Sequence, residues 1–201
     1  PEGTKQKDRN FVVDLPRYLR LFGYSIQHLD RTPSPNTGDA PKVARIGVIG
    51  RRNIEDSEDL RAGIEKVLET IHTECPPDSQ YVVASPLAEG GDQLVTGLIM
   101  KRLGASLTAV LPLPEKEYLA TFDSETGRTG LREFLAAARH RPTLPPVASG
   151  GTKAAFEQAG RWVVDDASYI IAIWDNKPDK GRGGTAEAVQ YGREKARKEG
   201  K

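Results

Sequence analysis

Apolar residues along the chain follow two alternating patterns, short continuous runs and longer stretches with helical spacing. The continuous runs, which are typical of buried strands, read VARIGVIG from residue 43, QYVVA from 80, SLTAVL from 106 and SYIIAIWD from 168. Between them, apolar residues recur every three or four positions, which predicts helices. The first is expected behind Asp56 and Ser57, either of which could cap it, and the second across 94–99, ending at Gly104. The others are expected around 131–138, over about 153–164 and over 185–198.

Strands that alternate with helices at this spacing predict an α/β fold, a Rossmann-like parallel sheet with helices on both faces and right-handed crossovers. We expect this domain to span 42–201. Residues 1–41 are interpreted as an N-terminal extension without a clear periodic element, followed by a linker rich in Pro, Asp, Asn, Thr and Gly. The Pro-bearing stretches PLPEKEY and RPTLPPVASGG are expected to be loops.

Composition narrows the class of protein. The 201 residues are 37% hydrophobic and 28% charged, and the formal net charge is +1. This balance is typical of a globular chain with no global field to attract nucleic acid or an anionic membrane. A single cysteine, Cys75, excludes an intrachain disulfide and suits the cytoplasm. No apolar run approaches the roughly 18 residues of a membrane span, and because the chain begins with Pro1 we expect a piece of a longer protein.

Three of the four predicted parallel strands end beside glycines. Because the carboxyl ends of parallel strands meet at one edge of the sheet, and ligands bind in the crevice beyond that edge, these glycines predict a binding site. They are Gly47 and Gly50, Gly90 and Gly91, and Gly181, Gly183 and Gly184.

Gly90 and Gly91 come just before a helix expected to begin near Asp92. The first N–H groups of a helix have no helical partner and carry partial positive charge, and glycine lets an anion approach the bare backbone. Ser85 adds a hydroxyl donor. The other interpretation is a tight turn in which Asp92 only caps its helix. This loop alone does not decide between an anion-binding site and a capped turn.

The stretch GRGGTAEAV after the last predicted strand repeats this arrangement. Gly183 and Gly184 precede a helix, Thr185 offers a hydroxyl, and Glu187 lies in the first turn. Glu187 is equally explained by its favourable position near the positive end of the helix dipole. Two such loops opening onto one crevice would hold two phosphates, or a phosphate and a ribose.

Charged residues near these strand ends have both ligand-binding and purely structural interpretations. Arg51 and Arg52 follow Gly50, where an arginine is suited to binding a phosphate; the other interpretation is a solvated basic pair. Asp175 is suited either to binding ribose hydroxyls or to starting a turn. Arg161 is expected either to point into the crevice or to pair with Asp165, four residues later on the same helix. The glycine pattern is neither the dinucleotide fingerprint nor the P-loop, so a standard NAD dehydrogenase or kinase is not expected.

At these motifs the chain resembles the SLOG superfamily, which includes the Smf/DprA and Lonely Guy proteins. The stretch SPLAEGGD from residue 85 resembles the DprA signature S-G-L-A-x-G-x-D, and Pro86 stands in place of the first glycine of that signature. The matching residues are Ser85, Leu87, Ala88, Gly90 and Asp92. The stretch 183–187 resembles the Lonely Guy phosphate loop, and 169–196 resembles SLOG domains found beside bacterial immune effectors. The resemblance covers roughly 43–197.

The resemblance implies a Rossmann-like fold and ligands that are nucleotides or their derivatives, including ADP-ribose-type signals. Some members hydrolyse nucleoside monophosphates to base and ribose phosphate, whereas others are sensors that regulate a fused effector in antiphage defence. The hydrolases carry P-G-G-x-G-T-x-x-E, but Ala188 stands here at the position of their glutamate, and Glu187 comes one residue early. One residue is about 100° of helix rotation, which argues against hydrolysis and leaves binding intact.

The sequence therefore favours a cytoplasmic ligand sensor that regulates a fused or associated effector in bacterial antiphage defence. Its expected ligand is a phosphorylated nucleotide, cyclic or of the ADP-ribose type, with no required cofactor or metal. We expect a homo-oligomer that neither binds nucleic acid nor inserts this chain into a membrane. The expected ligand-binding residues are Gly50, Arg51, Ser85, Glu89, Gly90, Gly91, Asp92, Asp175, Gly183, Gly184, Thr185 and Glu187.

Two other functions stay open. The first is a nucleoside 5′-monophosphate phosphoribohydrolase of the Lonely Guy type, with Glu187 as its catalytic carboxylate and Arg161 assisting. The second, suggested by DprA, is a single-stranded DNA binder. The near-zero net charge and the lack of an interleaved aromatic and basic run count against DNA binding.

Overall fold

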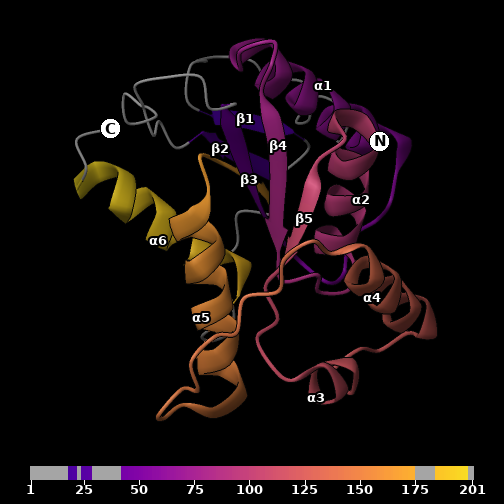
Figure 1. The fold of residues 1–201 in the computed structure, drawn as a ribbon, viewed down its shortest axis with the longest axis vertical. Helices are drawn as coiled ribbons and strands as arrows, with labels where there is room; N and C mark the ends of the chain where they lie inside the picture. Colours follow the sequence, from indigo (N-terminus) through magenta and orange to yellow (C-terminus); the bar gives the residue numbers. More distant parts are fainter. Residues whose placement is uncertain (1–17, 22–23, 29–41, 175–183, 199–201) are drawn as a thin grey trace, which may run out of the picture.

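The computed structural model describes residues 18–21, 24–28, 42–174 and 184–198. Within them lies one sheet whose parallel part confirms the predicted Rossmann-like α/β fold (Figure 1). The parallel strands are β3 (Val43–Gly50), β4 (Gln80–Ser85), β5 (Ser106–Ala109) and β6 (Tyr169–Ile173). The helices are α1 (Glu58–Glu74), α2 (Gly91–Leu103), α3 (Glu115–Leu119), α4 (Glu125–Ala137), α5 (Gly151–Asp166) and α6 (Thr185–Lys198).

The order of the parallel strands creates a natural crevice. They lie in the order β6-β3-β4-β5, so the chain moves outward from β3 to β4 and β5 and then returns to place β6 on the other side of β3. Gly50 at the end of β3 is paired in register with Ile173 at the end of β6. The direction of winding therefore reverses between β3 and β6, which is where open α/β sheets bind ligands.

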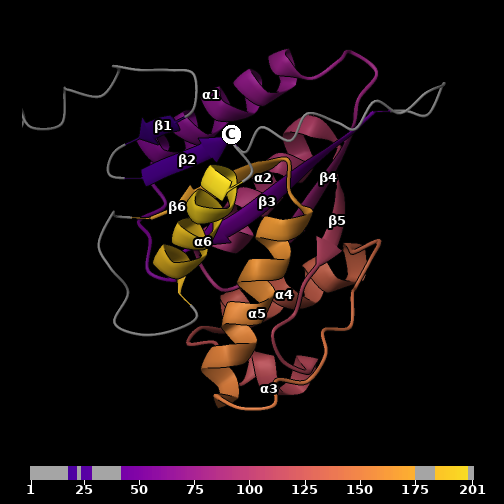
Figure 2. The ribbon, with the colours of Figure 1, turned by 90° about the vertical axis from the view of Figure 1, so that its left-hand side faces the viewer.

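Helices cover both faces of the sheet, as Figures 1 and 2 show. One core lies between the sheet and α1, α2 and α4, and the other between the sheet and α5 and α6. Apolar residues at helical spacing supply the first core, among them Leu60, Ile64 and Leu68 of α1, which are almost completely buried. No helix in the described part of the chain is both long and apolar enough to cross a membrane.

The predicted ends of the first two helices are confirmed in detail. Of the two cap candidates, Ser57 is the N-cap of α1, because its hydroxyl accepts a hydrogen bond from the N–H of Leu60. Gly104 ends α2 in the left-handed conformation at φ 62°, where glycine has no steric penalty.

Two segments differ from the sequence-based expectation. The N-terminal extension contributes β1 (Tyr18–Leu21) and β2 (Tyr24–His28), an antiparallel hairpin that pairs with β6 and continues the sheet across the predicted boundary near Lys42. The stretch expected to be only a Pro-bearing loop contains α3, which begins after Pro114. Proline is tolerated at a helix start because the first N–H groups have no helical partner there.

Candidate ligand-binding site

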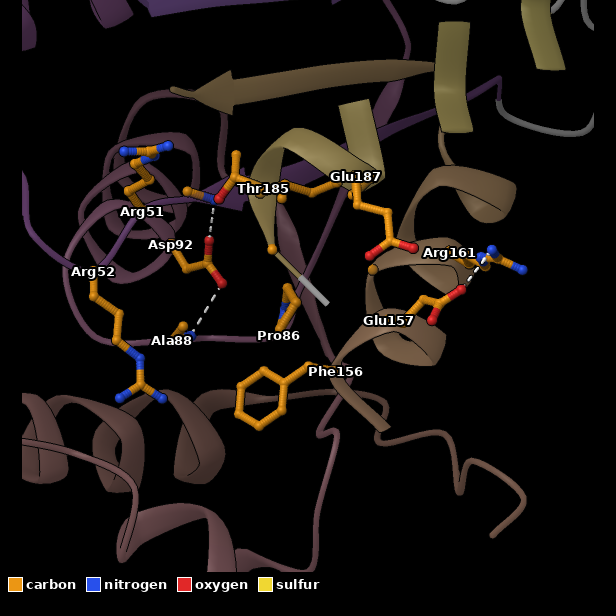
Figure 3. A pocket seen from close by; sticks show the side chains of 15 residues that line it. Arg51, Arg52, Pro86, Ala88, Asp92, Phe156, Glu157, Arg161, Thr185 and Glu187 are labelled. Carbon is orange, nitrogen blue, oxygen red and sulfur yellow. Dashed lines mark hydrogen bonds and ion pairs between the residues drawn. The ribbon is translucent and has the colours of Figure 1, made fainter. Parts of the chain in front are cut away.

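A cavity of about 230 Å³ lies at the carboxyl ends of β3 and β4 and beside the starts of α2 and α6 (Figure 3). We call it the switch-point cavity, because it sits where the strand order reverses. Its lining residues come from the segments 49–52, 86–92, 156–161 and 184–188. Four separate stretches of sequence therefore meet at the edge of the sheet where the glycines predicted a site.

The exit of β3 forms one wall of the cavity. Both Gly50 and Arg51, which the sequence proposed as ligand contacts, line it. The N–H of Arg51 donates to the carbonyl of Ile173 over 3.1 Å, which fixes this exit against the end of β6. The Arg51 side chain thus comes from backbone anchored at the switch point.

The Gly90-Gly91 turn approaches the protein's own backbone. A Cβ at Gly90, whose φ is +89°, would lie 1.9 Å from the carbonyl oxygen of Arg52. The N–H of Gly91 donates to the carbonyl of Arg51 over 2.9 Å, and a Cβ at Gly50 would lie 2.7 Å from the carbonyl carbon of Gly91. These glycines therefore let two loops pack backbone against backbone, and neither Gly90 nor Gly91 is among the lining residues.

Asp92, one of the proposed ligand contacts, lines the cavity at the start of α2, and its carboxyl group is bound to the protein's own backbone. Its carboxyl group accepts hydrogen bonds from the N–H groups of Gly50 and, at 3.0 Å, of Ala88. Asp92 is 2% exposed, and burial raises the pKa of its carboxyl to about 7, although those two N–H groups and the charge on Arg52 oppose the rise. Because Asp92 already accepts from these two N–H groups, neither is free to bind a phosphate.

Ser85 and Glu89 have structural partners outside the cavity lining. The hydroxyl of Ser85 is fully buried and accepts from the N–H of Leu87. The carboxylate of Glu89 accepts from the N–H groups of Asp123 and Ser124 and from the Ser124 hydroxyl, next to the start of α4. Burial alone would raise the pKa of Glu89, but these hydrogen bonds lower it below its ordinary value. Neither residue is brought to the site for which the sequence proposed it.

The start of α6 forms the opposite wall. The proposed ligand contacts Gly184, Thr185 and Glu187 all line the cavity, and Thr185 is 6% exposed. The one-residue offset of Glu187 from the Lonely Guy pattern therefore does not remove it from the cavity. The predicted contacts Gly183 and Asp175 lie outside the described residues.

Arg161 also lines the cavity, but its partner differs from the one considered in the sequence. It pairs with Glu157 one turn earlier on α5, at 2.5 Å, and its guanidinium lies 5.1 Å from the ring centre of Tyr191. Asp165 instead binds Lys195 and the Tyr191 hydroxyl. Glu157 belongs to no motif in the sequence, and only its spacing from Arg161, which is that of a helical ion pair, could have pointed to it.

Arg52, which the sequence offered beside Arg51 as a phosphate ligand, also lines the cavity, as do Pro86 of the DprA-like motif and Phe156, to which no sequence motif pointed. The guanidinium of Arg52 points away from the strand ends and donates to the carbonyl and the hydroxyl of Thr121. Unlike Arg51, Arg52 is thus anchored to the segment between α3 and α4. The sequence did not indicate an aromatic side chain in the cavity lining, because Phe156 fits the helical spacing of an ordinary core residue.

The lining combines groups suited to an organic anion. Two features of the lining favour negative charge. One is the positive charge of Arg51, and the other is the start of α6, because the first N–H groups of a helix carry partial positive charge. Carboxylates of Glu157 and Glu187 can accept hydrogen bonds from hydroxyl groups. Among the described residues, no group of three or more His, Cys, Asp or Glu side chains could hold a metal ion.

Comparison with known proteins adds no relative. No protein-family model matches the chain, and no curated protein matches its sequence.

Proposed function

We propose that the chain binds a phosphorylated, nucleotide-derived ligand in the switch-point cavity and acts as a sensor for it. One observation carries this proposal: residues from two predicted glycine-bearing strand exits, Gly50-Arg51 and Gly184-Thr185, line the same cavity. Its position at the reversal of strand order is the usual ligand position in such sheets. The sequence resemblance to SLOG sensors supports the nucleotide character of the ligand.

The phosphate is proposed to lie between Arg51 and the first turn of α6, rather than at the start of α2. The N–H groups of Gly50 and Ala88, next to the start of α2, already donate to Asp92, whereas Gly184 and Thr185 are part of the cavity lining. Small-molecule pockets commonly measure about 300–1,000 Å³, so a cavity of about 230 Å³ favours one nucleotide unit over a whole dinucleotide.

Calorimetry against a panel of nucleoside monophosphates, cyclic nucleotides and ADP-ribose tests this function. We expect at least one to bind more tightly than millimolar. Arg51→Gln should weaken that binding roughly 10- to 100-fold, because it removes a charge-assisted hydrogen bond. Arg102→Gln is the matched control, since Arg102 makes an exposed ion pair with Glu65 away from the cavity. Absence of any binding would contradict the proposal.

The effector role is part of the same proposal. A sensor in antiphage defence would pass ligand occupancy to a fused or associated effector, and this requires that the ligand prefer one conformational or oligomeric state. The cavity supports this role because α5 and α6 pack against each other and both contribute to its lining. A ligand there contacts both helices and can bias their relative position.

Hydrolysis of nucleoside 5′-monophosphates is a second candidate, because Glu157 and Glu187 place two carboxylates in one cavity. Paired carboxylates are the usual catalysts of glycosidic cleavage. In this reaction water would replace the base at the ribose carbon and release free base and ribose 5-phosphate. Chromatography after incubation with adenosine monophosphate tests it: free adenine from wild type but not from Glu187→Gln would establish the hydrolase.

A further inference from the structure

The switch-point cavity has a charged part and an aromatic part. In the view of Figure 3, Glu157, Arg161 and Glu187 gather on one side, whereas Phe156 and Pro86 lie nearer to Asp92 and Ala88. A ligand that fills the cavity therefore meets ionic groups over one portion and flat apolar side chains over another.

Phe156 is held firmly by its neighbours. Its ring contacts the ring of Tyr118 edge-on, with the centres 5.7 Å apart and the planes at 63°. The guanidinium of Arg52 lies 6.0 Å from the Phe156 ring centre and 5.9 Å from that of Phe122. Tyr118 is completely buried, so the ring of Phe156 rests on a rigid support and loses little further freedom when a ligand binds.

The exposure of Phe156 differs from that of the core side chains around it. Tyr118 and Leu131 are fully buried, and Phe122 is 2% exposed. Phe156 is only partly buried, packed against this core while also lining the cavity. A purely structural role needs the buried portion of the ring and gives no reason for an aromatic surface at the cavity wall.

We propose that Phe156, with Pro86 beside it in the lining, stacks against the base of the ligand and distinguishes nucleotides from sugar phosphates. This inference rests on the proposed function, since it assigns the base to one part of the same cavity and the phosphate to Arg51 and the start of α6. Stacking accepts every base because each has a π-face, and larger rings stack over more area. The expected order of affinity is purine monophosphates, then pyrimidine monophosphates, then ribose 5-phosphate.

The test compares adenosine monophosphate with ribose 5-phosphate by calorimetry on wild type, Phe156→Leu and Phe156→Trp. Leucine keeps the apolar volume that supports the core but lacks the flat ring, whereas tryptophan keeps a stacking surface. Phe156→Leu should weaken adenosine monophosphate binding roughly 5- to 150-fold and leave ribose 5-phosphate binding within twofold. Phe156→Trp should retain the preference for the nucleotide, and circular dichroism confirms that each variant is folded.

The outcomes separate this inference from the function on which it rests. If wild type binds both probes equally, or if Phe156→Leu weakens both by the same factor, base stacking at Phe156 is wrong while phosphate binding stands. If neither these probes nor the wider nucleotide panel binds wild type, the proposed function fails and the inference fails with it.

Discussion

Asp92 has a buried carboxyl group whose role could not be decided from the local sequence. The residue joins the exit of β3 to the loop after β4, because its two oxygens accept from Gly50 and Ala88. From sequence, a glycine pair before an acidic residue fitted both an anion site and a capped turn. The choice depends on Gly50 and Arg52, about forty residues away along the chain, and no local pattern encodes that contact.

Titration of Asp92 should make stability depend on pH. The pKa of its carboxyl rises from 3.8 to about 7 on folding, so between these values the folded state holds a proton that the unfolded chain has lost. Its contribution to stability is therefore greatest below about pH 4 and falls as the pH rises to about 7, by on the order of 4 kcal/mol. Denaturant unfolding of wild type and Asp92→Asn across pH 4–8 measures this. A constant difference between the two proteins would contradict it.

Gly90→Ala should be among the more destabilising single substitutions. A methyl group there would collide with the Arg52 carbonyl, and the φ of +89° is itself unfavourable for alanine. We expect a loss of about 3 kcal/mol or more in the free energy of unfolding. Gly104→Ala is the control, because its φ is also positive, at +62°, but no atom lies within 4 Å of the added group. It should cost about 1 kcal/mol. Equal losses would show that the packing of the two loops is not what requires glycine at Gly90.

Among the elements, the parallel strands and their long helices could be predicted because apolar runs and helical stripes are local properties of sequence. The hairpin of β1 and β2 could not, since its strands gain their place by pairing with each other and with β6, more than a hundred residues away. Likewise, α3 is only five residues long and follows prolines that by composition indicate a loop.

Glu89 belongs to the stability of an element rather than to the ligand site. Its carboxylate accepts from the backbone at Asp123 and Ser124, just before α4. Glu89→Ala should therefore lower the free energy of unfolding by about 1–2 kcal/mol and leave ligand affinity within twofold. Thermal unfolding and calorimetry on the same variant check both parts. An affinity loss of tenfold or more in a folded variant would return Glu89 to the binding site.

At the scale of the whole molecule, helical layers pack on opposite faces of the sheet (Figure 2), and α5 and α6, which line the cavity, belong to the same layer. A ligand that contacts α5 and α6 together with the exits of β3 and β4 can bias how this layer sits against the sheet. This arrangement suits a sensor whose output is a change in assembly.

Ligand binding is expected to shift the oligomeric equilibrium. Light scattering after size exclusion, with and without saturating ligand, should give different average masses if the ligand prefers one assembly state. Arg51→Gln should abolish the shift at the same ligand concentration, because it weakens binding at the cavity. An unchanged mass for wild type at full occupancy would separate ligand binding from assembly and leave only the binding function.

The central claim is that a phosphate is held between Arg51 and the first turn of α6. A nuclear magnetic resonance titration of the backbone amides with the tightest-binding nucleotide tests it most directly. The largest shifts should fall on Arg51, Gly184 and Thr185, with a smaller shift at Gly91, whose N–H already donates to the Arg51 carbonyl. Shifts centred on Gly91 and the start of α2, or located away from the switch-point cavity, would contradict the account.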